Sequence, residues 1–388
     1  MPFDPEDNVF LLAGPIKMHP RVVRAMAVPA WNHRGPEFAR VTKELGELLQ
    51  YAFQTTAPVV PLTGSGTAGL EAAVGAVVNP GDKVVALTNG NFGERMGTLG
   101  TLYAGEGHCT VLKHEWGTPY DWTKAEATIR EQRPKAVLLT HNETSAGITN
   151  PLEKVCQVAH EVGALVVADC ITSIGGIDVP VERWGVDLAV TGSQKALGAP
   201  PGLAFVSIGP RAREAMKGVK PRSLYLSLAK HLEKWEKENF NAPTTPATHL
   251  YFAALEGLRL LKEQGLQHRF QHVHRTAQAC REAAKALHLQ LLPPPGHESE
   301  TVTAMRYPQG IEDAKFRGAL KDKHGVVVSG GQGPVKGKVF RIGTMGTVDF
   351  RDLAAGFAAI EVEFNAQGHK VTAGAGVAAI EHAMARAG

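Results

Sequence analysis

The sequence has few cysteines and no long apolar run, and each shortage excludes a class of protein. Its four cysteines form no C-x-x-C pair, so we predict no disulfide framework and no zinc site and expect a reducing compartment. No apolar run approaches the roughly 20 residues of a membrane span. The N-terminal stretch "MPFDPEDNVF" is acidic and proline-rich, unlike a secretory signal, and we therefore expect a cytoplasmic protein.

The chain also lacks a strong excess of either charge. In 388 residues, 41 basic side chains are spread among 38 acidic ones, for a formal net charge of +3. Binding to nucleic acid or to a membrane surface usually requires a basic stripe or arm, and none is present. We therefore expect small-molecule partners.

What is present is an alternation of short apolar runs with helical patterns between about residues 55 and 210. This order is typical of a mostly parallel sheet that is covered by helices on both faces. An irregular segment rich in proline and glycine precedes it, followed by a helical pattern over 39–53. The apolar runs that we expect to be strands are 57–64, 82–89, 109–114, 135–142, 164–170, 186–192 and 202–209.

A proline- and threonine-rich passage, "NFNAPTTPATHLY", opens a long helical stretch up to residue 287. The remaining third mixes helical patterns with strand-like runs, which indicates a smaller α+β domain. The fold class is thus α/β with a second domain. We predict an N-terminal arm over 1–20, a large domain over 21–250 and a small C-terminal domain over 251–388.

One lysine lies in an unusual setting. Lys195, in "TGSQKALGAPPG", has no acidic residue near it in sequence, because none occurs between Leu188 and Arg213. A buried ammonium without a counter-charge tends to lose its proton, and a neutral lysine is a nucleophile toward carbonyl groups. Taken alone, Lys195 also fits an ordinary exposed loop.

Two further features lie where ligands of open α/β sheets bind. Asp169 ends the apolar run "ALVVAD", and a carboxylate there can keep a pyridine nitrogen protonated, although it also fits a turn or helix cap. The stretch "LTGSGTAGLEAAV" passes from a strand through a small-residue turn into a helix, which is typical of a phosphate cradle. It also spells G-x-G-x-x-G, but no acidic residue follows the next apolar run, where a dinucleotide-binding fold needs one.

Three other residue types are candidates for ligand contacts. Phe92, which follows a predicted strand, can stack on a flat ring. Arg341, in "KVFRIGTMG", can bind a carboxylate through two hydrogen bonds. His268 and His272 lie four residues apart on a helical pattern, but no acidic residue nearby completes a metal site, so we predict no metal.

Together these motifs resemble the class V aminotransferases that depend on pyridoxal 5'-phosphate (PLP) and have fold type I, in the alanine–glyoxylate, serine–glyoxylate and serine–pyruvate group. The resemblance covers nearly the whole chain, with motifs such as "NGNFGERM" and "THNETSAGITNPL", and is most specific in "GSQKALGAPPG". It implies a homodimer with active sites at the subunit interface.

The resemblance also implies roles for individual residues. Lys195 would form the Schiff base with the cofactor, and Asp169 would pair with its ring nitrogen. Arg341 would bind the substrate carboxylate, and Thr244 of the neighbouring subunit would complete the phosphate site, with Asn241 where some relatives have tyrosine. His33 and Arg34 would lie near the active site or the dimer contact. The remaining cofactor contacts implied are Ser65, Gly66, Thr67 and Gln194 at the phosphate, and Phe92, Thr144 and Ile171 at the ring.

The activity implied is transfer of an amino group from alanine or serine to glyoxylate or pyruvate by a ping-pong mechanism. Other donors within the same class stay open, namely aspartate, 2-aminoethylphosphonate and ureidoglycine. A nucleotide-binding oxidoreductase and a non-catalytic subunit are further alternatives. A cysteine desulfurase is disfavoured because Cys280 lies in a helical pattern, where such an enzyme needs a cysteine on a mobile loop.

Overall fold

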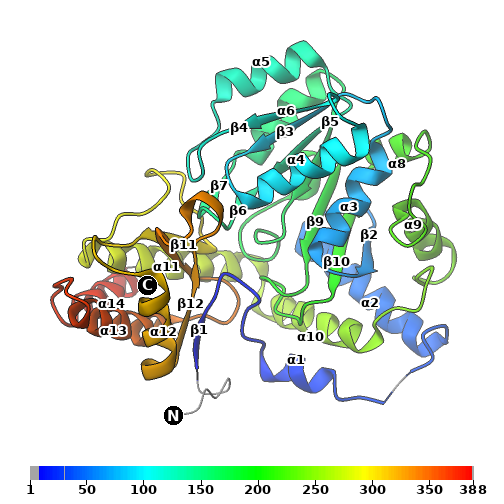
Figure 1. The fold of residues 1–388 in the computed structure, drawn as a ribbon. Coiled ribbons are helices and arrows are strands. Elements are labelled where there is room, and N and C mark those ends of the chain that lie inside the picture. Colours follow the sequence, from blue (N-terminus) through cyan, green and yellow to red (C-terminus); the bar gives the residue numbers. More distant parts are fainter. Residues whose placement is uncertain (1–7, 30, 387–388) are drawn as a thin grey trace.

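A large mixed sheet forms the centre of the computed structural model, which describes residues 8–29 and 31–386 (Figure 1). The expected α/β fold with a mostly parallel sheet is confirmed, and the seven predicted strands are all present. Every strand runs in one direction except β10, which is antiparallel to both of its neighbours. The order across the sheet is β2 (Val59–Thr63), β10 (Leu203–Ile208), β9 (Leu188–Gly192), β8 (Leu165–Asp169), β5 (Ala136–Thr140), β3 (Val84–Thr88) and β4 (Cys109–Lys113).

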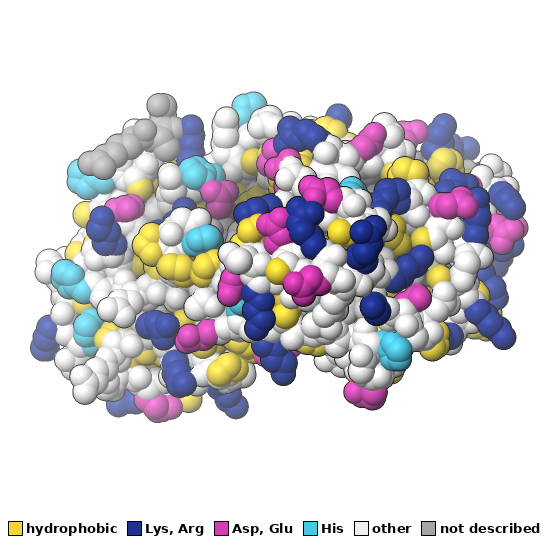
Figure 2. Space-filling view, turned by 90° about the horizontal axis from the view of Figure 1, so that it is seen from above, with side chains coloured by type: hydrophobic (Ala, Val, Ile, Leu, Met, Phe, Trp, Pro, Cys, Tyr) yellow, Lys and Arg dark blue, Asp and Glu magenta, His cyan; other side chains and the backbone are white. Residues whose placement is uncertain are grey.

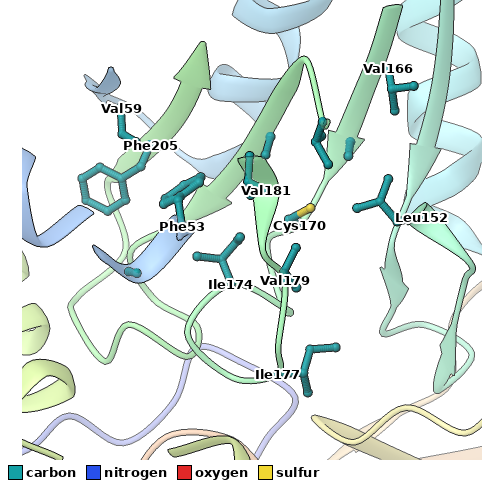
Figure 3. Packing of buried hydrophobic residues seen from close by; sticks show 14 of the residues in the cluster. Phe53, Val59, Leu152, Val166, Cys170, Ile174, Ile177, Val179, Val181 and Phe205 are labelled. Atoms are coloured by element: carbon teal, nitrogen blue, oxygen red, sulfur yellow. The ribbon is translucent and has the colours of Figure 1, made fainter. Parts of the chain in front are cut away.

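Helices cover both faces of this sheet, which explains why its inner strands are apolar along most of their length. In β3, Val85 and Leu87 pack into one core cluster, while Val84 and Ala86 pack into a second cluster on the opposite face. Figure 3 shows part of the first cluster, where Val166 and Cys170 lie near Leu152. The helices around the sheet are α3 (Gly66–Val77), α4 (Asn91–Ala104), α5 (Trp122–Gln132), α6 (Leu152–Glu161), α7 (Val181–Trp184), α8 (Pro210–Met216) and α9 (Leu228–Lys237).

A second, four-stranded sheet has its own core cluster. Its order is β1 (Val9–Leu11), β12 (Val326–Gly330), β13 (Val339–Gly343) and β11 (Val302–Arg306), and helices α12 (Asp313–His324), α13 (Phe350–Ala366) and α14 (Ala375–Arg386) accompany it. Strand β1 was not predicted, because three residues are too few to show a periodic pattern. It pairs in parallel with β12, so residues 9–11 of the predicted arm belong to this sheet. The remaining short strands are β6 (Asn142–Glu143) and β7 (Ile148–Thr149), and a 3₁₀ turn covers Gly333–Val335.

Four helices lie outside these groups: α1 (Pro20–Ala25), α2 (Pro36–Phe53), α10 (Thr248–Gln264) and α11 (Leu266–Ala286). The predicted helical stretch up to residue 287 is two helices, because the chain breaks at Gly265, whose φ of +79° favours glycine. Helix α10 packs with α2 in the large core, whereas the later part of α11, including Cys280, packs with the small sheet. The division into an arm over 1–20 and domains over 21–250 and 251–388 stays a prediction.

The surface and the helices carry two further observations. Figure 2 shows Lys and Arg side chains interspersed with Asp and Glu side chains over the face in view. None of the helices in the described part of the chain is both long and apolar enough to cross a membrane.

Candidate active site

A cavity of about 140 Å³ lies where strands β5 and β8 end and helices α3 and α4 begin. Ligands of open α/β sheets bind at this edge, beyond the carboxyl ends of the parallel strands. The cavity brings together every cofactor contact that the sequence predicted, apart from Thr244. Its lining is formed by Ser65, Gly66, Thr67, Phe92, Arg95, Thr140, Asn142, Thr144, Asp169, Ile171, Thr172, Gln194 and Lys195.

Lys195 lies in the tight connection between β9 and β10. The Ser193 hydroxyl donates to the Pro200 carbonyl at 2.6 Å, which holds this connection in place. Lys195 Nζ donates a hydrogen bond of 2.6 Å to the carbonyl of Ala13 in the arm. Burial lowers the pKa of Lys195 to about 8; the charge of Arg341 adds to this effect and Asp169 opposes it. A substantial fraction of the side chain is therefore neutral near pH 8.

The arm passes so close to Lys195 that residue 14 must be glycine. A Cβ at Gly14 would overlap Lys195 Nζ, and the φ of +107° at Gly14 is one that other residues rarely adopt. The Ile16 N–H also donates to the Gln194 carbonyl at 3.2 Å. Contact between the arm and the lysine connection was not predicted, because nothing in the sequence pairs segments 182 residues apart.

Asp169 is the last residue of β8 and is 3% exposed. Its Oδ1 accepts a hydrogen bond of 3.0 Å from the Ile171 N–H. Burial raises the pKa of Asp169 to about 7, and the nearby Glu143 carboxylate contributes, while the Ile171 hydrogen bond and the charges of Arg95 and Lys195 oppose the shift. The carboxylate is thus held in a site where a positively charged partner would favour its ionised form.

The turn before α3 has the form of an anion cradle. Ser65 occupies the N-cap position but its side chain caps no backbone N–H, so the first turn of this 12-residue helix leaves its N–H groups free of side-chain partners. A Cβ at Gly66 would lie 2.6 Å from Ile171 Cδ1, which explains the glycine. The buried Gln194 Oε1, in the same cavity, has no hydrogen-bond partner among the described residues.

Glu143, which the sequence analysis did not single out, holds the start of α4. Its Oε2 accepts hydrogen bonds from the N–H groups of Phe92 (3.0 Å) and Gly93 (2.8 Å), and its Oε1 accepts one from the Ser145 hydroxyl. It is fully buried, and burial raises its pKa. This carboxylate therefore fixes the backbone that carries Phe92. Its place just after β5, at the same edge as Asp169, was the signal that could have revealed it.

Arg341 is buried in β13 and reaches toward the large sheet. Its Nε and Nη2 donate to the Gly330 carbonyl at 3.0 and 2.7 Å, and its Nη1 donates to the Thr144 carbonyl at 2.7 Å. It forms no ion pair with the described residues. Burial lowers its pKa to about 10, so the guanidinium stays charged at neutral pH. Thr144, which lines the cavity, thus connects Arg341 to it.

The other predicted residues lie elsewhere. Thr244 lies in the connection between α9 and α10, outside the cavity. His33, Arg34 and Asn241 line a separate surface cavity of about 290 Å³. On α11, the His272 ring is 2.8 Å from the Val348 carbonyl, and no group of three or more potential metal ligands occurs in residues 8–29 and 31–386.

Comparison with known proteins identifies relatives that match almost the whole length of the chain. The family model described as aminotransferase class-V matches residues 22–349. An uncharacterised aminotransferase of Methanocaldococcus jannaschii is 36% identical, with 96% of each chain covered. The small subunit of a soluble hydrogenase of a Synechococcus species is 35% identical, with 98% of this chain and 99% of that protein covered.

Relatives with named substrates are similar over most of their length. An alanine–glyoxylate aminotransferase of Callithrix jacchus is 32% identical, with 87% of this chain and 83% of that protein covered. Among solved structures, the ureidoglycine–glyoxylate aminotransferase of Bacillus subtilis superposes with a TM-score of 0.93 at 30% identity, covering 97% of this chain and 98% of that one.

Proposed function

Because the chain belongs to the class-V aminotransferases, we propose that it transfers the amino group of a small L-amino acid, alanine or serine, to glyoxylate or pyruvate. The observation that carries this proposal is a single cavity that holds a lysine with a lowered pKa and an aspartate with a raised pKa. Perturbed titratable groups that share a cavity are typical of catalytic sites.

The cofactor of this family is PLP, and the cavity fits it. The N–H groups at the start of α3 that lack side-chain partners can donate to a phosphate monoester, and the unpaired Gln194 Oε1 can accept a hydrogen bond from a donor group of a ligand. Asp169 suits a ring nitrogen, and Phe92 and Ile171 offer apolar contacts to a flat ring. When bound, PLP supplies a ring that takes up the electrons released when a bond to the substrate Cα breaks.

We assign the proton transfer to Lys195. A general base works best when its pKa lies near the working pH, and Lys195 Nζ, with a pKa of about 8, meets this condition. The neutral amine can take a proton from the substrate Cα and return it to a neighbouring carbon. The Ala13 carbonyl gives Nζ a hydrogen-bond acceptor within the site, so the amine has a defined resting position.

Arg341 orients the substrate. Three of its five N–H groups donate to the carbonyls of Gly330 and Thr144, which leaves one N–H on each terminal nitrogen without a partner among the described residues. These two groups can donate to the two oxygens of a carboxylate. Holding the carboxylate in this way presents the Cα–H bond to Lys195, and orientation of this kind contributes to the rate.

The charges around the cavity support a small amino acid donor with an uncharged side chain. Aspartate, which carries a second carboxylate, needs a further cation beside its side chain, and 2-aminoethylphosphonate, which has a phosphonate and no carboxylate, needs more than one cation for its doubly charged group. Among the described lining residues the cations are Lys195 and Arg95, and Arg95 lies at the cradle, with its Nη1 2.8 Å from Thr67 Oγ1. Ureidoglycine, the substrate named for the Bacillus subtilis relative, is the principal alternative because it carries no second acidic group.

Two of the alternatives are disfavoured. Family membership argues against a nucleotide-binding oxidoreductase. The presence of Lys195, Asp169 and Arg341 argues against a non-catalytic subunit, despite the similarity to a hydrogenase small subunit. We also propose a homodimer in which Thr244 reaches the partner's cavity, and a cytoplasmic location, which the four free cysteine thiols support.

The test is the visible absorption spectrum of the purified protein with PLP. Alanine, serine, aspartate and ureidoglycine are added separately, with no keto acid present. We expect a yellow protein that alanine or serine bleaches, followed by recovery of the colour with glyoxylate or pyruvate. Bleaching by aspartate or ureidoglycine alone would replace the proposed donor, and a protein that stays colourless with PLP would overturn the assignment of Lys195.

A further inference from the structure

The cradle at α3 has no assigned positive charge. Every side chain and backbone group that the family resemblance assigns to the phosphate within one chain, from Ser65, Gly66, Thr67 and Gln194, is neutral. We propose that Arg95 binds the cofactor's phosphate group and gives this cradle the unit positive charge that its other groups do not supply. This inference rests on the proposed PLP-dependent function.

The position of Arg95 carries the inference. It is the fifth residue of α4, three residues after Phe92, and lines the same cavity as Ser65 and Gly66. Its Nη1 donates a hydrogen bond of 2.8 Å to Thr67 Oγ1. Its guanidinium carbon lies 5.0 Å from the centroid of the Phe92 ring. Arg95 therefore connects the cradle to the aromatic ring that is expected to contact the cofactor.

Arg95 also has free capacity to bind an anion. It forms no ion pair with any described carboxylate, and the hydrogen bond to Thr67 uses one of its five N–H groups. Arg95 is only partly buried and lines the cavity, so an anion in the cavity can reach it. The planar fork of N–H groups matches two oxygens of a phosphate.

The charge of the ligand requires such a group. A phosphate monoester carries a charge of about −1.5 to −2 at pH 7, whereas a helix N-terminus contributes only about +0.5. Lys195 is committed to the other end of the cofactor. Among the described residues that line the cavity, Arg95 is the remaining cation.

A purely structural role for Arg95 makes a different prediction. If Arg95 only packed on Phe92, its loss would weaken binding of the cofactor's ring as much as binding of its phosphate. If it only held Thr67, Arg95→Gln would cause no further loss of PLP affinity in a protein that already carries Thr67→Ala. The comparison of PLP with pyridoxal, which lacks the phosphate, separates the two roles. Both compounds carry the aldehyde that reacts with Lys195, so the ratio of their dissociation constants isolates the phosphate contribution.

We would measure both dissociation constants by absorbance and fluorescence titration of the cofactor-free protein. In Arg95→Gln, we expect PLP affinity to fall roughly ten- to hundredfold, the range for hydrogen bonds to a charged group, with pyridoxal affinity unchanged. Arg95→Lys, which keeps the charge but loses the fork, should recover part of the loss. Equal losses for both compounds, or no loss for PLP, would overturn the proposal.

A matched control is available at Arg222. This arginine also lies over an aromatic ring, 4.4 Å from the centroid of Tyr103, but outside this cavity. Arg222→Gln should leave the PLP-to-pyridoxal ratio at the wild-type value, and thermal unfolding would confirm that each variant folds. No amino acid is present in this titration, so a wrong donor assignment leaves the result intact. If the wild-type protein did not prefer PLP over pyridoxal, both the cradle and the proposed role of Arg95 would fail.

Discussion

The two sheets contribute to the site in different ways. The seven-stranded sheet presents its side chains at or just beyond successive strand ends: Thr140 ends β5, Asp169 ends β8 and Lys195 follows β9. The four-stranded sheet contributes Arg341 from within β13. That side chain is held by the carbonyls of Gly330 in the small sheet and of Thr144 in the turn between β6 and β7, so its place depends on the small sheet and on the segment that follows β5.

The two buried cations show what this difference achieves. Lys195 and Arg341 both lack a carboxylate partner among the described residues, and both donate to backbone carbonyls. Burial lowers the pKa of each, to about 8 for Lys195 and about 10 for Arg341. Near neutral pH the large sheet thus holds a cation that can lose its proton, while the small sheet holds one that stays charged.

The arm connects these two regions. The Ala13 N–H donates to Ser329 Oγ in the small sheet at 3.1 Å, and the Ala13 carbonyl accepts from Lys195 Nζ. The two peptide groups that flank Ala13 are therefore bonded to different parts of the fold, one to the small sheet and the other to Lys195 beside the large sheet. The following predictions test whether the two cations have separate tasks.

The largest effect is expected at Lys195. In Lys195→Ala, turnover should fall by at least about 10³-fold, because the nucleophile and the general base are lost together. The visible spectrum of the variant with PLP should resemble that of the free cofactor. Lys154→Ala, which removes an exposed lysine that packs on Trp122, is the control and should keep wild-type turnover. Turnover near the wild-type rate in Lys195→Ala would contradict the assignment.

A smaller effect, on substrate binding, is expected at Arg341. In Arg341→Lys, the charge remains but the fork of N–H groups is lost, so KM for the amino acid should rise about 10- to 100-fold. The spectrum of the lysine-bound cofactor should stay unchanged, because Arg341 does not line the cofactor cavity. Steady-state kinetics with alanine and serine provide the measurement. A normal KM with a changed cofactor spectrum would mean that Arg341 affects the cofactor and not substrate binding. The two sheets would then not have separate roles.

The strands of the large sheet were predictable because they are buried on both faces. Residues such as Val84 and Val85 are apolar regardless of the face they point to, so each strand reads as a continuous apolar run. The rule that ligands bind at the ends of such strands then singled out Asp169, and the lack of acidic residues between Leu188 and Arg213 singled out Lys195. The structure brings these residues into one cavity, while their individual roles stay predictions.

What could not be predicted depends on contacts between distant segments. The hydrogen bond from Lys195 to Ala13 and the hydrogen bonds of Glu143 to the start of α4 have no local sequence signal. Arg95 lies in a helical pattern, where an arginine is usually exposed. Strand β1 is too short to show a period, and its pairing with β12 is set by tertiary packing.

The third prediction concerns stability at the edge of the large sheet. The pKa of Asp169 is raised to about 7 in the fold, so between about pH 4 and 7 the folded state binds more protons than the unfolded state, and stability falls as pH rises. In the cofactor-free protein, Asp169→Asn should therefore be more stable than wild type at pH 8, by a few kcal/mol at most, at about 1.4 kcal/mol per pKa unit. This gain in stability should shrink as the pH falls below 7. The catalytic activity of Asp169→Asn should be lower than that of the wild type.

His141, at the same edge, supplies a control of opposite sign. Burial lowers its pKa from 6.5 to about 4, so the unfolded state binds the extra proton between these values and the wild type loses stability as pH falls through them. His141→Asn should reduce this loss of stability at acid pH. The higher stability of Asp169→Asn at pH 8 should be the same with or without the His141 substitution. Denaturant unfolding of the cofactor-free variants from about pH 4 to 8 tests both slopes. A stability curve for Asp169→Asn that runs parallel to wild type would show that the pKa of Asp169 is the same in the folded and unfolded states, which would contradict the prediction.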